Sequence, residues 1–210
     1  MLKVNYMFVV WVILQAVFDM TLPEVIGNKF LYFAYGSNLL AKRIHIKNPT
    51  AVRKCIGKLK NHRLDFFYYA TRWGGAPSTV VPAQGENVWG AIWEIDMENL
   101  DSLDKQEGVH RGVYQPLSLP IETPRGETLI CRVYQLVNNP DDFPTKNGVM
   151  LDERKPSYSY IQVLINGAIE SGLPEYYVEF LKSVEHNGNL GKPELISSLN
   201  LNLTQNIKSD

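Results

Sequence analysis

Residues 30–38 read FLYFAYGSN, and this stretch decides the fold prediction for the chain around it. Residues 30–35 are all aromatic or apolar, which is typical of a buried strand. Gly36, Ser37 and Asn38 favour loops, so the strand is expected to end there abruptly. Residues 39–46 then predict a short helix, which Pro49 stops. We therefore expect a buried strand that opens directly into a tight turn.

Strand-like segments follow in the middle of the chain, and helical segments lie near its end. The strands are expected at 58–69, 87–95, 114–121 and 127–137, and the helices at 97–107, 157–170 and 175–184. Asp96 is expected to cap the first of these helices and Gly108 to end it. The turn TPRG at 123–126 joins the last two strands as a hairpin. This order predicts an α+β domain rather than alternating βαβ units.

The length and composition of the chain indicate one globular domain. It has 210 residues, of which 45% are hydrophobic and 20% charged, values that suit a single core. The net charge is −1 and no basic run occurs, so neither nucleic acid nor an anionic membrane surface is favoured as a partner. We expect the domain at 28–191, after an apolar segment at 1–27 and before a polar, loosely held tail at 192–210.

The N-terminal segment leaves two interpretations open. An apolar run from Tyr6 to Phe18 follows Lys3, and it is too short for a membrane span of about 20 residues. Its length and basic flank fit a secretory signal, in which case the protein is secreted and the glycosylation sequon at 202–204 matters. Alternatively the segment is dispensable, because Met20 could itself start the protein just before Phe30.

The cysteines and histidines predict no metal site. Cys55 and Cys131 lie far apart, and no CxxC pair or histidine cluster has ligand spacing. The two cysteines are interpreted as structural thiols. A disulfide between them is the alternative, and it requires an oxidising compartment.

Glu107 is the candidate catalytic residue. It follows Leu100 and Leu103 at helical spacing, so the three side chains share one face that should point into the core. A carboxylate there is unfavourable unless it is paired or protonated. Desolvation and the negative end of the helix both raise its pKa, which makes it a competent proton carrier near neutral pH. The alternative is that Glu107 turns outward toward Arg111 at a frayed helix end.

The turn at 35–38 is a candidate anion-binding site. A strand that opens into Gly-Ser-Asn can aim several backbone N–H groups at one point, where a carboxylate or a developing oxyanion binds. Gly36 permits close approach of a ligand. The same junction is also common as a purely structural turn. The chain has no GxSxG elbow and no GxxxxGK[ST] loop, so neither a hydrolase serine nor a P-loop is supported.

Two segments resemble the γ-glutamylcyclotransferases of animals. LYFAYGSNLL at 31–40 resembles the opening strand and loop of that family, and NLDSLDKQEGV at 99–109 resembles the end of its catalytic helix. Shorter matches follow in the same order: VWG at 88–90, CRVY at 131–134, NGA at 166–168 and GLP at 172–174. The resemblance covers roughly residues 30–191, and the two longer segments together are far more specific than either one alone.

The resemblance implies a small mixed, mainly antiparallel β-barrel flanked by helices, a homodimer, and no cofactor or metal. It implies a cytoplasmic enzyme that converts γ-glutamyl-amino acids to 5-oxoproline, with Glu107 as the acid/base. It places the small-molecule γ-glutamyl substrate against eight residues: Tyr32, Phe33, Ala34, Tyr35, Gly36, Ser37, Asn38 and Tyr134. Tyr134 could equally be ordinary barrel packing.

Departures from the family pattern keep the alternatives open. The apolar N-terminal segment leaves the compartment undecided, and residues 68–77 and 138–155 differ from what the family leads us to expect. One alternative is a cyclotransferase acting on glutathione or on γ-glutamylamines. The other is a binding protein that keeps the γ-glutamyl pocket but does no chemistry.

Overall fold

The structure is a computed structural model that describes residues 25–142, 144–146, 148–201 and 203. The apolar run at 6–18 and Asn202 of the sequon therefore lie outside the described residues. Among the described residues, no helix is both long enough and apolar enough to cross a membrane.

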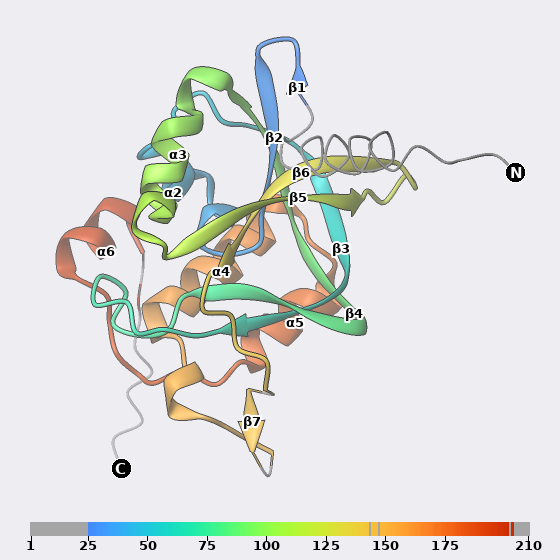
Figure 1. The fold of residues 1–210 in the computed structure, drawn as a ribbon. Coiled ribbons are helices and arrows are strands. Elements are labelled where there is room, and N and C mark those ends of the chain that lie inside the picture. The colour runs from blue at the N-terminus through green and yellow to red at the C-terminus, as the bar shows by residue number, and fades with distance from the viewer. Residues whose placement is uncertain (1–24, 143, 147, 202, 204–210) are drawn as a thin grey trace, which may run out of the picture.

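Five strands close into a small barrel (Figure 1). They are β2 (Lys29–Ala34), β3 (Val52–Phe66), β4 (Ser78–Asp96), β5 (Tyr114–Glu122) and β6 (Thr128–Leu136). Neighbouring strands are antiparallel in the order β2-β4-β3-β5-β6. A parallel pairing of β2 with β6, through Tyr32 and Arg132, closes the sheet. This mixed barrel with helices around it confirms the α+β prediction.

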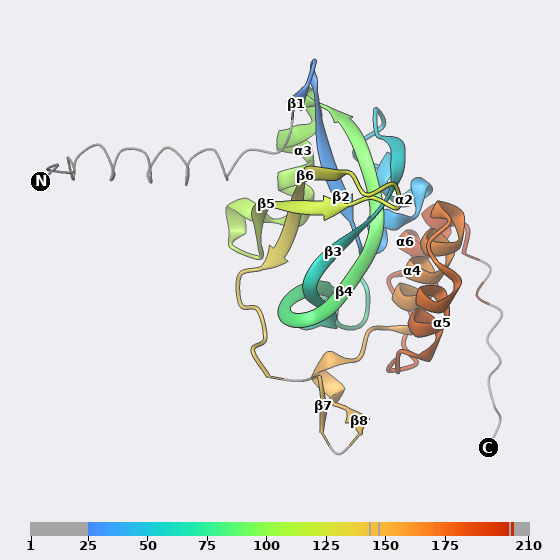
Figure 2. The same cartoon turned by 90° about the vertical axis from the view of Figure 1, so that its right-hand side faces the viewer.

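Strand β2 is buried along its length, as its sequence predicted. Every side chain from Phe30 to Tyr35 is at most 5% exposed. A strand that is apolar at every position must be covered on both faces. Here the interior of the barrel covers one face and helical segments cover the other (Figure 2). The short strand β1 (Val25–Ile26) extends the sheet beyond β2.

Strands β3 and β4 are longer than predicted, and both begin earlier. Residues 78–86 were not among the predicted strands, and they contain Pro82 and Gly85, residue types that are rare inside strands. In the structure β4 runs through them, and the register shifts between Lys60 and His62 on the facing strand. The β-bulge accommodates the extra residues, so β4 bends instead of ending.

The helices gather mainly on one side of the barrel (Figure 2). These are α2 (Ala41–His45), α4 (Tyr158–Ser171), α5 (Glu175–Ser183) and α6 (Pro193–Leu199), whereas α3 (Leu100–Glu107) lies on the other side. Short 3-10 turns occur at Ser37–Leu39, Met97–Asn99, Val109–Arg111 and Asp152–Arg154. The predicted loop at 138–155 also holds a small hairpin, β7 (Thr145–Lys146) and β8 (Val149–Met150).

Two local predictions are wrong. Asp96 directly precedes the 3-10 turn Met97–Asn99, but its side chain makes no capping hydrogen bond there. Its carboxylate lies instead 3.8 Å from the Lys29 ammonium. The tail at 192–210 is not loosely held throughout, because α6 packs on the domain. Leu195 and Leu199 lie one turn apart on α6 and are both buried in the core cluster. Burial of this apolar pair fixes α6 against the domain.

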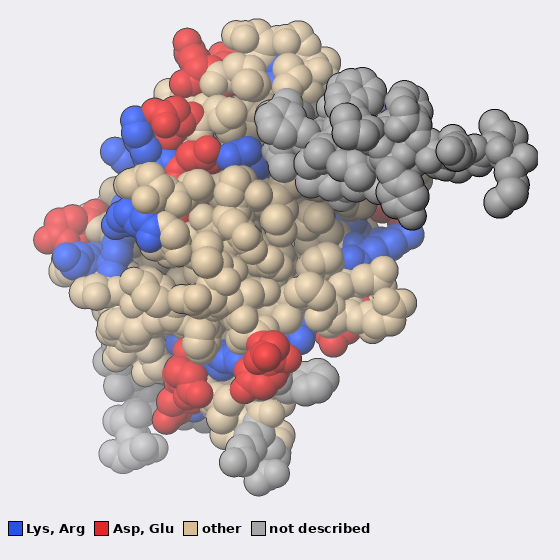
Figure 3. Space-filling view, viewed as in Figure 1, with Lys and Arg blue, Asp and Glu red and all other residues tan. Residues whose placement is uncertain are grey.

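Other predictions are confirmed. The hairpin of β5 and β6 forms around residues 123–126, and Gly108 ends α3 in the left-handed conformation with φ +71°. Cys55 and Cys131 are free thiols. On the face seen in Figure 3, charged side chains form small separate groups around a largely uncharged centre, in keeping with the net charge of −1.

Candidate active site

A small cavity lies where β2 leaves the barrel. Its lining comes from six separate places in the sequence and consists of ten residues: Tyr32, Tyr35, Gly36, Ser37, Asn38, Ser78, Glu107, Tyr114, Tyr134 and Tyr160. The cavity and its mouth enclose about 310 Å³. Glu107 is the one acidic side chain in this lining, and five tyrosines surround it. The cavity therefore brings a single carboxyl group together with many hydroxyl groups.

Close packing explains the glycine in the turn. A Cβ at Gly36 would overlap with the Ser78 hydroxyl oxygen and lie 3.2 Å from the Tyr160 hydroxyl. That serine is itself fixed, because its oxygen lies 2.9 Å from the same tyrosine hydroxyl. The chain after β2 can therefore reach the cavity wall only without a side chain at this position.

The turn presents free backbone donors to the cavity. In the described part of the chain, the amides of Ser37 and Asn38 have no hydrogen-bond acceptor. Both residues line the cavity. Two neighbouring amides without partners can bind a carboxylate or an oxyanion.

Glu107 faces the cavity and not the solvent side of α3. Leu103, one turn earlier, is completely buried, so the apolar stripe points inward as predicted. The Oε1 atom of Glu107 accepts hydrogen bonds from Asn38 Nδ2 at 3.1 Å and from Gln106 Nε2 at 3.2 Å. The alternative in which Glu107 turns outward toward Arg111 is not found.

The surroundings of Glu107 favour its protonated form. Burial raises the pKa of the Glu107 carboxyl above its usual range, and the nearby Asp104 carboxylate adds to this. The positive charge of Arg43 and the hydrogen bonds from Gln106 and Asn38 lower the pKa, but they offset the burial only in part. A carboxyl group balanced in this way can both accept and return a proton.

This balance predicts that Glu107 destabilises the fold at neutral pH. Because its pKa is higher in the folded chain than in the unfolded chain, stability falls as pH rises from the unfolded pKa through the folded pKa. Glu107→Gln should therefore have a higher Tm than the unmodified protein at pH 7–8, and the two should converge below about pH 4. Thermal melts across this range test it. A Tm difference that is independent of pH would contradict it.

The tyrosines around the cavity are neutral donors and acceptors. Burial raises the pKa of Tyr32, Tyr114 and Tyr160 above the ordinary value for a tyrosine. Tyr32 accepts from Asn38 Nδ2 at 3.0 Å. Tyr160 accepts from the Ser78 amide at 3.0 Å, and Tyr114 donates to the Ser78 carbonyl at 2.8 Å. These bonds fix the cavity wall without placing another charge in it.

A polar cluster ties α3 to the barrel. The Tyr134 hydroxyl donates to Asp104 Oδ1 at 2.5 Å, and the guanidinium of Arg132 donates to both oxygens of Asp104 at 2.7 and 2.8 Å. Asp104 precedes Glu107 by three residues on α3. The cluster thus fixes the angle at which α3 presents Glu107 to the cavity.

The structure places most of the predicted site residues together. Seven of them line the cavity: Tyr32, Tyr35, Gly36, Ser37, Asn38, Glu107 and Tyr134. Phe33 and Ala34 are completely buried and lie outside this lining. Phe33 alternates with Tyr32 along the strand and packs its ring against Gly90 of β4 instead.

Several residues of the site were not predicted. Ser78, Tyr114 and Tyr160 line the cavity, and Asp104, Gln106 and Arg132 support it from outside. The sequence placed Arg132 and Tyr134 on one face of their strand, which is the only local signal among these residues. Contacts between distant segments assemble the rest.

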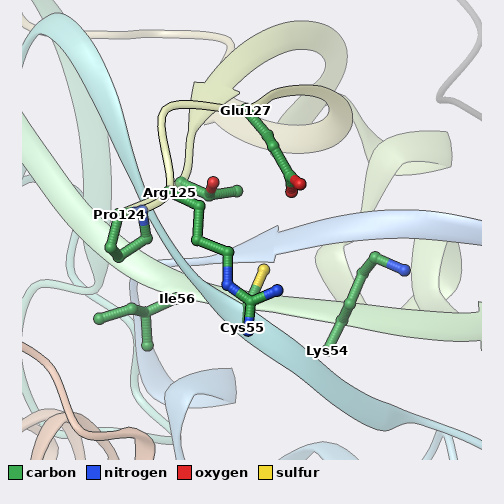
Figure 4. Close-up of a pocket in the computed structure, with 7 residues that line it drawn as sticks. Lys54, Cys55, Ile56, Pro124, Arg125 and Glu127 are labelled. Carbon is green, nitrogen blue, oxygen red and sulfur yellow. The ribbon is translucent and has the colours of Figure 1, made fainter.

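A second hollow lies beside the turn of the β5–β6 hairpin (Figure 4). It is lined by Lys54, Cys55, Ile56, Thr123, Pro124, Arg125 and Glu127. Desolvation raises the pKa of the Cys55 thiol, which disfavours the thiolate that a nucleophile requires. Lys54 is paired with Glu94 at 2.5 Å. This hollow therefore supports no chemistry comparable to that of the Glu107 cavity.

Comparisons with known proteins agree on one family. Residues 87–181 match the AIG2-like family. The gamma-glutamylcyclotransferase of Mus musculus is 40% identical over 170 residues, which cover 79% of this chain and 84% of that protein. The gamma-glutamylcyclotransferase of Homo sapiens is 38% identical over 178 residues, which cover 83% and 87%.

A solved structure agrees in fold. A structure described as gamma-glutamyl cyclotransferase superposes with a TM-score of 0.71 at 35% identity, covering 82% of this chain and 98% of that one. The chain therefore belongs to the γ-glutamylcyclotransferase family.

Proposed function

We propose that this protein converts γ-glutamyl-amino acids into 5-oxoproline and a free amino acid, with Glu107 as the acid/base. The observation that carries the proposal is the placement of Glu107. Its side chain is partly buried, its carboxyl has a raised pKa, and it lines a cavity together with the two turn residues whose amides are free. The family to which the chain belongs supports the same activity.

The reaction is an intramolecular aminolysis. The α-amine of the γ-glutamyl group attacks its own γ-carbonyl carbon, a five-membered lactam closes, and the bond to the leaving amine breaks. The cavity must fold the γ-glutamyl chain so that nitrogen and carbon meet. Orientation of this kind contributes roughly 7–11 kcal/mol to catalysis in intramolecular reactions.

Glu107 transfers the proton in both halves of the reaction. Its carboxylate first takes a proton from the substrate ammonium, because only the free amine is nucleophilic. The resulting carboxylic acid gives that proton to the leaving nitrogen, and the bond to it breaks as the carbonyl reforms. The ring nitrogen then loses its second proton to the regenerated carboxylate and becomes the lactam N–H. Glu107 passes this second proton to the departing amine, which leaves as an ammonium. Oε1 already accepts hydrogen bonds from Asn38 and Gln106. We therefore assign the proton transfer to Oε2, which accepts no hydrogen bond from the described residues.

The turn supplies the second element of the mechanism. The amides of Ser37 and Asn38 would hold either the α-carboxylate of the substrate or the oxyanion that forms on the γ-carbonyl. A single oxyanion donor stabilises a transition state by about 2.7–4 kcal/mol. The neutral tyrosines exclude water and repel no anion, because burial keeps them protonated.

A substrate panel tests the proposal. The purified protein is incubated with γ-glutamyl-alanine, glutathione and a γ-glutamylamine, and 5-oxoproline is quantified by chromatography. We expect the highest kcat/KM on γ-glutamyl-alanine. If glutathione or the γ-glutamylamine were turned over faster, the proposed substrate class would be wrong, but the proposed cyclisation to 5-oxoproline would stand. Recovery of all three compounds unchanged would instead mean a binding protein.

A further inference from the structure

A directed hydrogen-bond relay connects Arg43 of α2 to Glu107. Arg43 NH1 donates to Gln106 Oε1 at 3.2 Å. Gln106 Nε2 donates to Asn38 Oδ1 and to Glu107 Oε1, both at 3.2 Å. Asn38 Nδ2 in turn donates to Tyr32 and to Glu107. We propose that Arg43 is a positioning residue, which orients this relay and thereby sets how Glu107 handles its proton.

Arg43 determines the direction of every bond in the relay. A guanidinium only donates, so the Gln106 side chain must turn its oxygen toward Arg43. The amide nitrogen of Gln106 then faces Asn38 and Glu107, and Asn38 must present its oxygen to Gln106. The nitrogen of Asn38 is left to face Tyr32 and Glu107. Each of the two side-chain amides could otherwise flip. Arg43 locks both in the orientation in which their nitrogens donate to Oε1 of Glu107.

Arg43 is a buried cation without an ion-pair partner among the described residues. The residue is only 5% exposed, yet in the described part of the chain it forms no ion pair, and its Nε atom has no hydrogen-bond partner. A buried charge without a carboxylate partner is unfavourable, so such residues tend to serve a function. Of the groups around Arg43, Glu107 is the main source of favourable charge.

Arg43 is also the cation that acts on Glu107. The other groups facing Glu107 are Asp104 on the same helix and, from the packed elements, the neutral hydroxyls of Tyr32, Tyr35, Tyr114, Tyr134 and Tyr160. Arg72, from the loop before β4, faces Arg43. Without Arg43, burial and Asp104 would both hold the proton on Glu107, and the carboxylate needed to accept the substrate proton would be scarce.

The consequence for turnover rests on the proposed function, whereas the effect on Glu107 itself does not. The test therefore uses two readouts. One is the titration of the Glu107 carboxyl carbon by ¹³C NMR in glutamate-labelled protein, assigned with Glu107→Gln. The other is the pH profile of kcat/KM on γ-glutamyl-alanine.

Three variants separate charge from packing. Arg43→Met removes the charge and the donor, Arg43→Lys keeps the charge, and Lys42→Met removes a charge from an exposed neighbour on the same helix. In Arg43→Met we expect Glu107 to titrate at a higher pH than in the unmodified protein. The acid limb of kcat/KM should move with it and reduce activity there by roughly tenfold or more. Arg43→Lys should restore most of this loss, and Lys42→Met should match the unmodified protein in both readouts.

An unchanged Glu107 titration in folded Arg43→Met would overturn the proposal. If that variant does not fold, Gln106→Leu interrupts the same relay and must raise the titration pH of Glu107; no change there would overturn it equally. If the unmodified protein forms no 5-oxoproline while the titration still shifts, the proposed function fails and the role of Arg43 stands.

Discussion

Glu107→Gln is expected to reduce 5-oxoproline formation from γ-glutamyl-alanine by roughly 10²–10⁴-fold, the usual contribution of a general acid/base. The amide oxygen of glutamine can still accept the hydrogen bonds of Asn38 and Gln106, so the cavity should keep its shape. The amide nitrogen, however, cannot take a proton from the substrate ammonium. The loss should therefore appear in kcat, with KM little changed.

Glu98→Gln is the matched control for this experiment. Glu98 is an exposed glutamate at the start of the same helical segment, and its side chain accepts a hydrogen bond from Asn99 Nδ2 at 3.4 Å. Its substitution removes the same charge and should leave kcat within about twofold, as expected for an exposed position away from the cavity. If Glu107→Gln were as active as Glu98→Gln, Glu107 would have no part in proton transfer.

Gly36→Ala is expected to have the second largest effect. The new methyl group would overlap with the Ser78 oxygen, which is bonded to Tyr160, so the turn must move away from the wall. Overpacking of this kind lowers stability by about 1–3 kcal/mol. A displacement of about 1 Å at the amides of Ser37 and Asn38 reduces turnover by roughly 10²-fold. Urea denaturation and steady-state kinetics measure the two effects.

Ser78→Ala provides the control for the clash. That change removes the oxygen that the new methyl group would strike, while the Ser78 Cβ lies at an ordinary distance of 3.7 Å. The double variant should therefore recover most of the stability lost in Gly36→Ala. If the double variant is no more stable than Gly36→Ala, contact with Ser78 is not the reason for the glycine.

The sequence predicted the parts of the site that lie on periodic elements. Residues 30–35 are apolar without interruption, so a doubly covered strand followed from them directly. Glu107 falls on the stripe of Leu100 and Leu103, and Gly108 ends the helix, so its position and orientation were also predictable. In both cases the signal lies within a dozen residues.

The remaining parts depend on contacts between distant segments. Tyr160 and Ser78 are 82 residues apart, and Arg43 and Gln106 are 63 apart, so no local pattern could pair them. Ser78 also opens a strand that Pro82 and Gly85 conceal in the sequence. Phe33 and Ala34 were assigned to the site from the resemblance as one block, although alternation along the strand turns Phe33 away from Tyr32.

The short helix α6 was not predicted from the sequence. Leu195 and Leu199 have helical spacing, but the helix spans only seven residues. Short helices gain little from their own propensity and are stabilised by tertiary contacts. The pair on α6 is buried in the core cluster of the domain, which sequence periodicity alone does not reveal.

A crystal structure of the Glu107→Gln variant with γ-glutamyl-alanine tests the central claim most directly. We predict that the γ-glutamyl group occupies the cavity, with its α-amine within hydrogen-bond distance of the substituted side chain at position 107. One of its oxygens should lie within hydrogen-bond distance of the Ser37 and Asn38 amides. A substrate bound instead in the hollow beside Cys55, with the Glu107 cavity empty, would contradict the account (Figure 4).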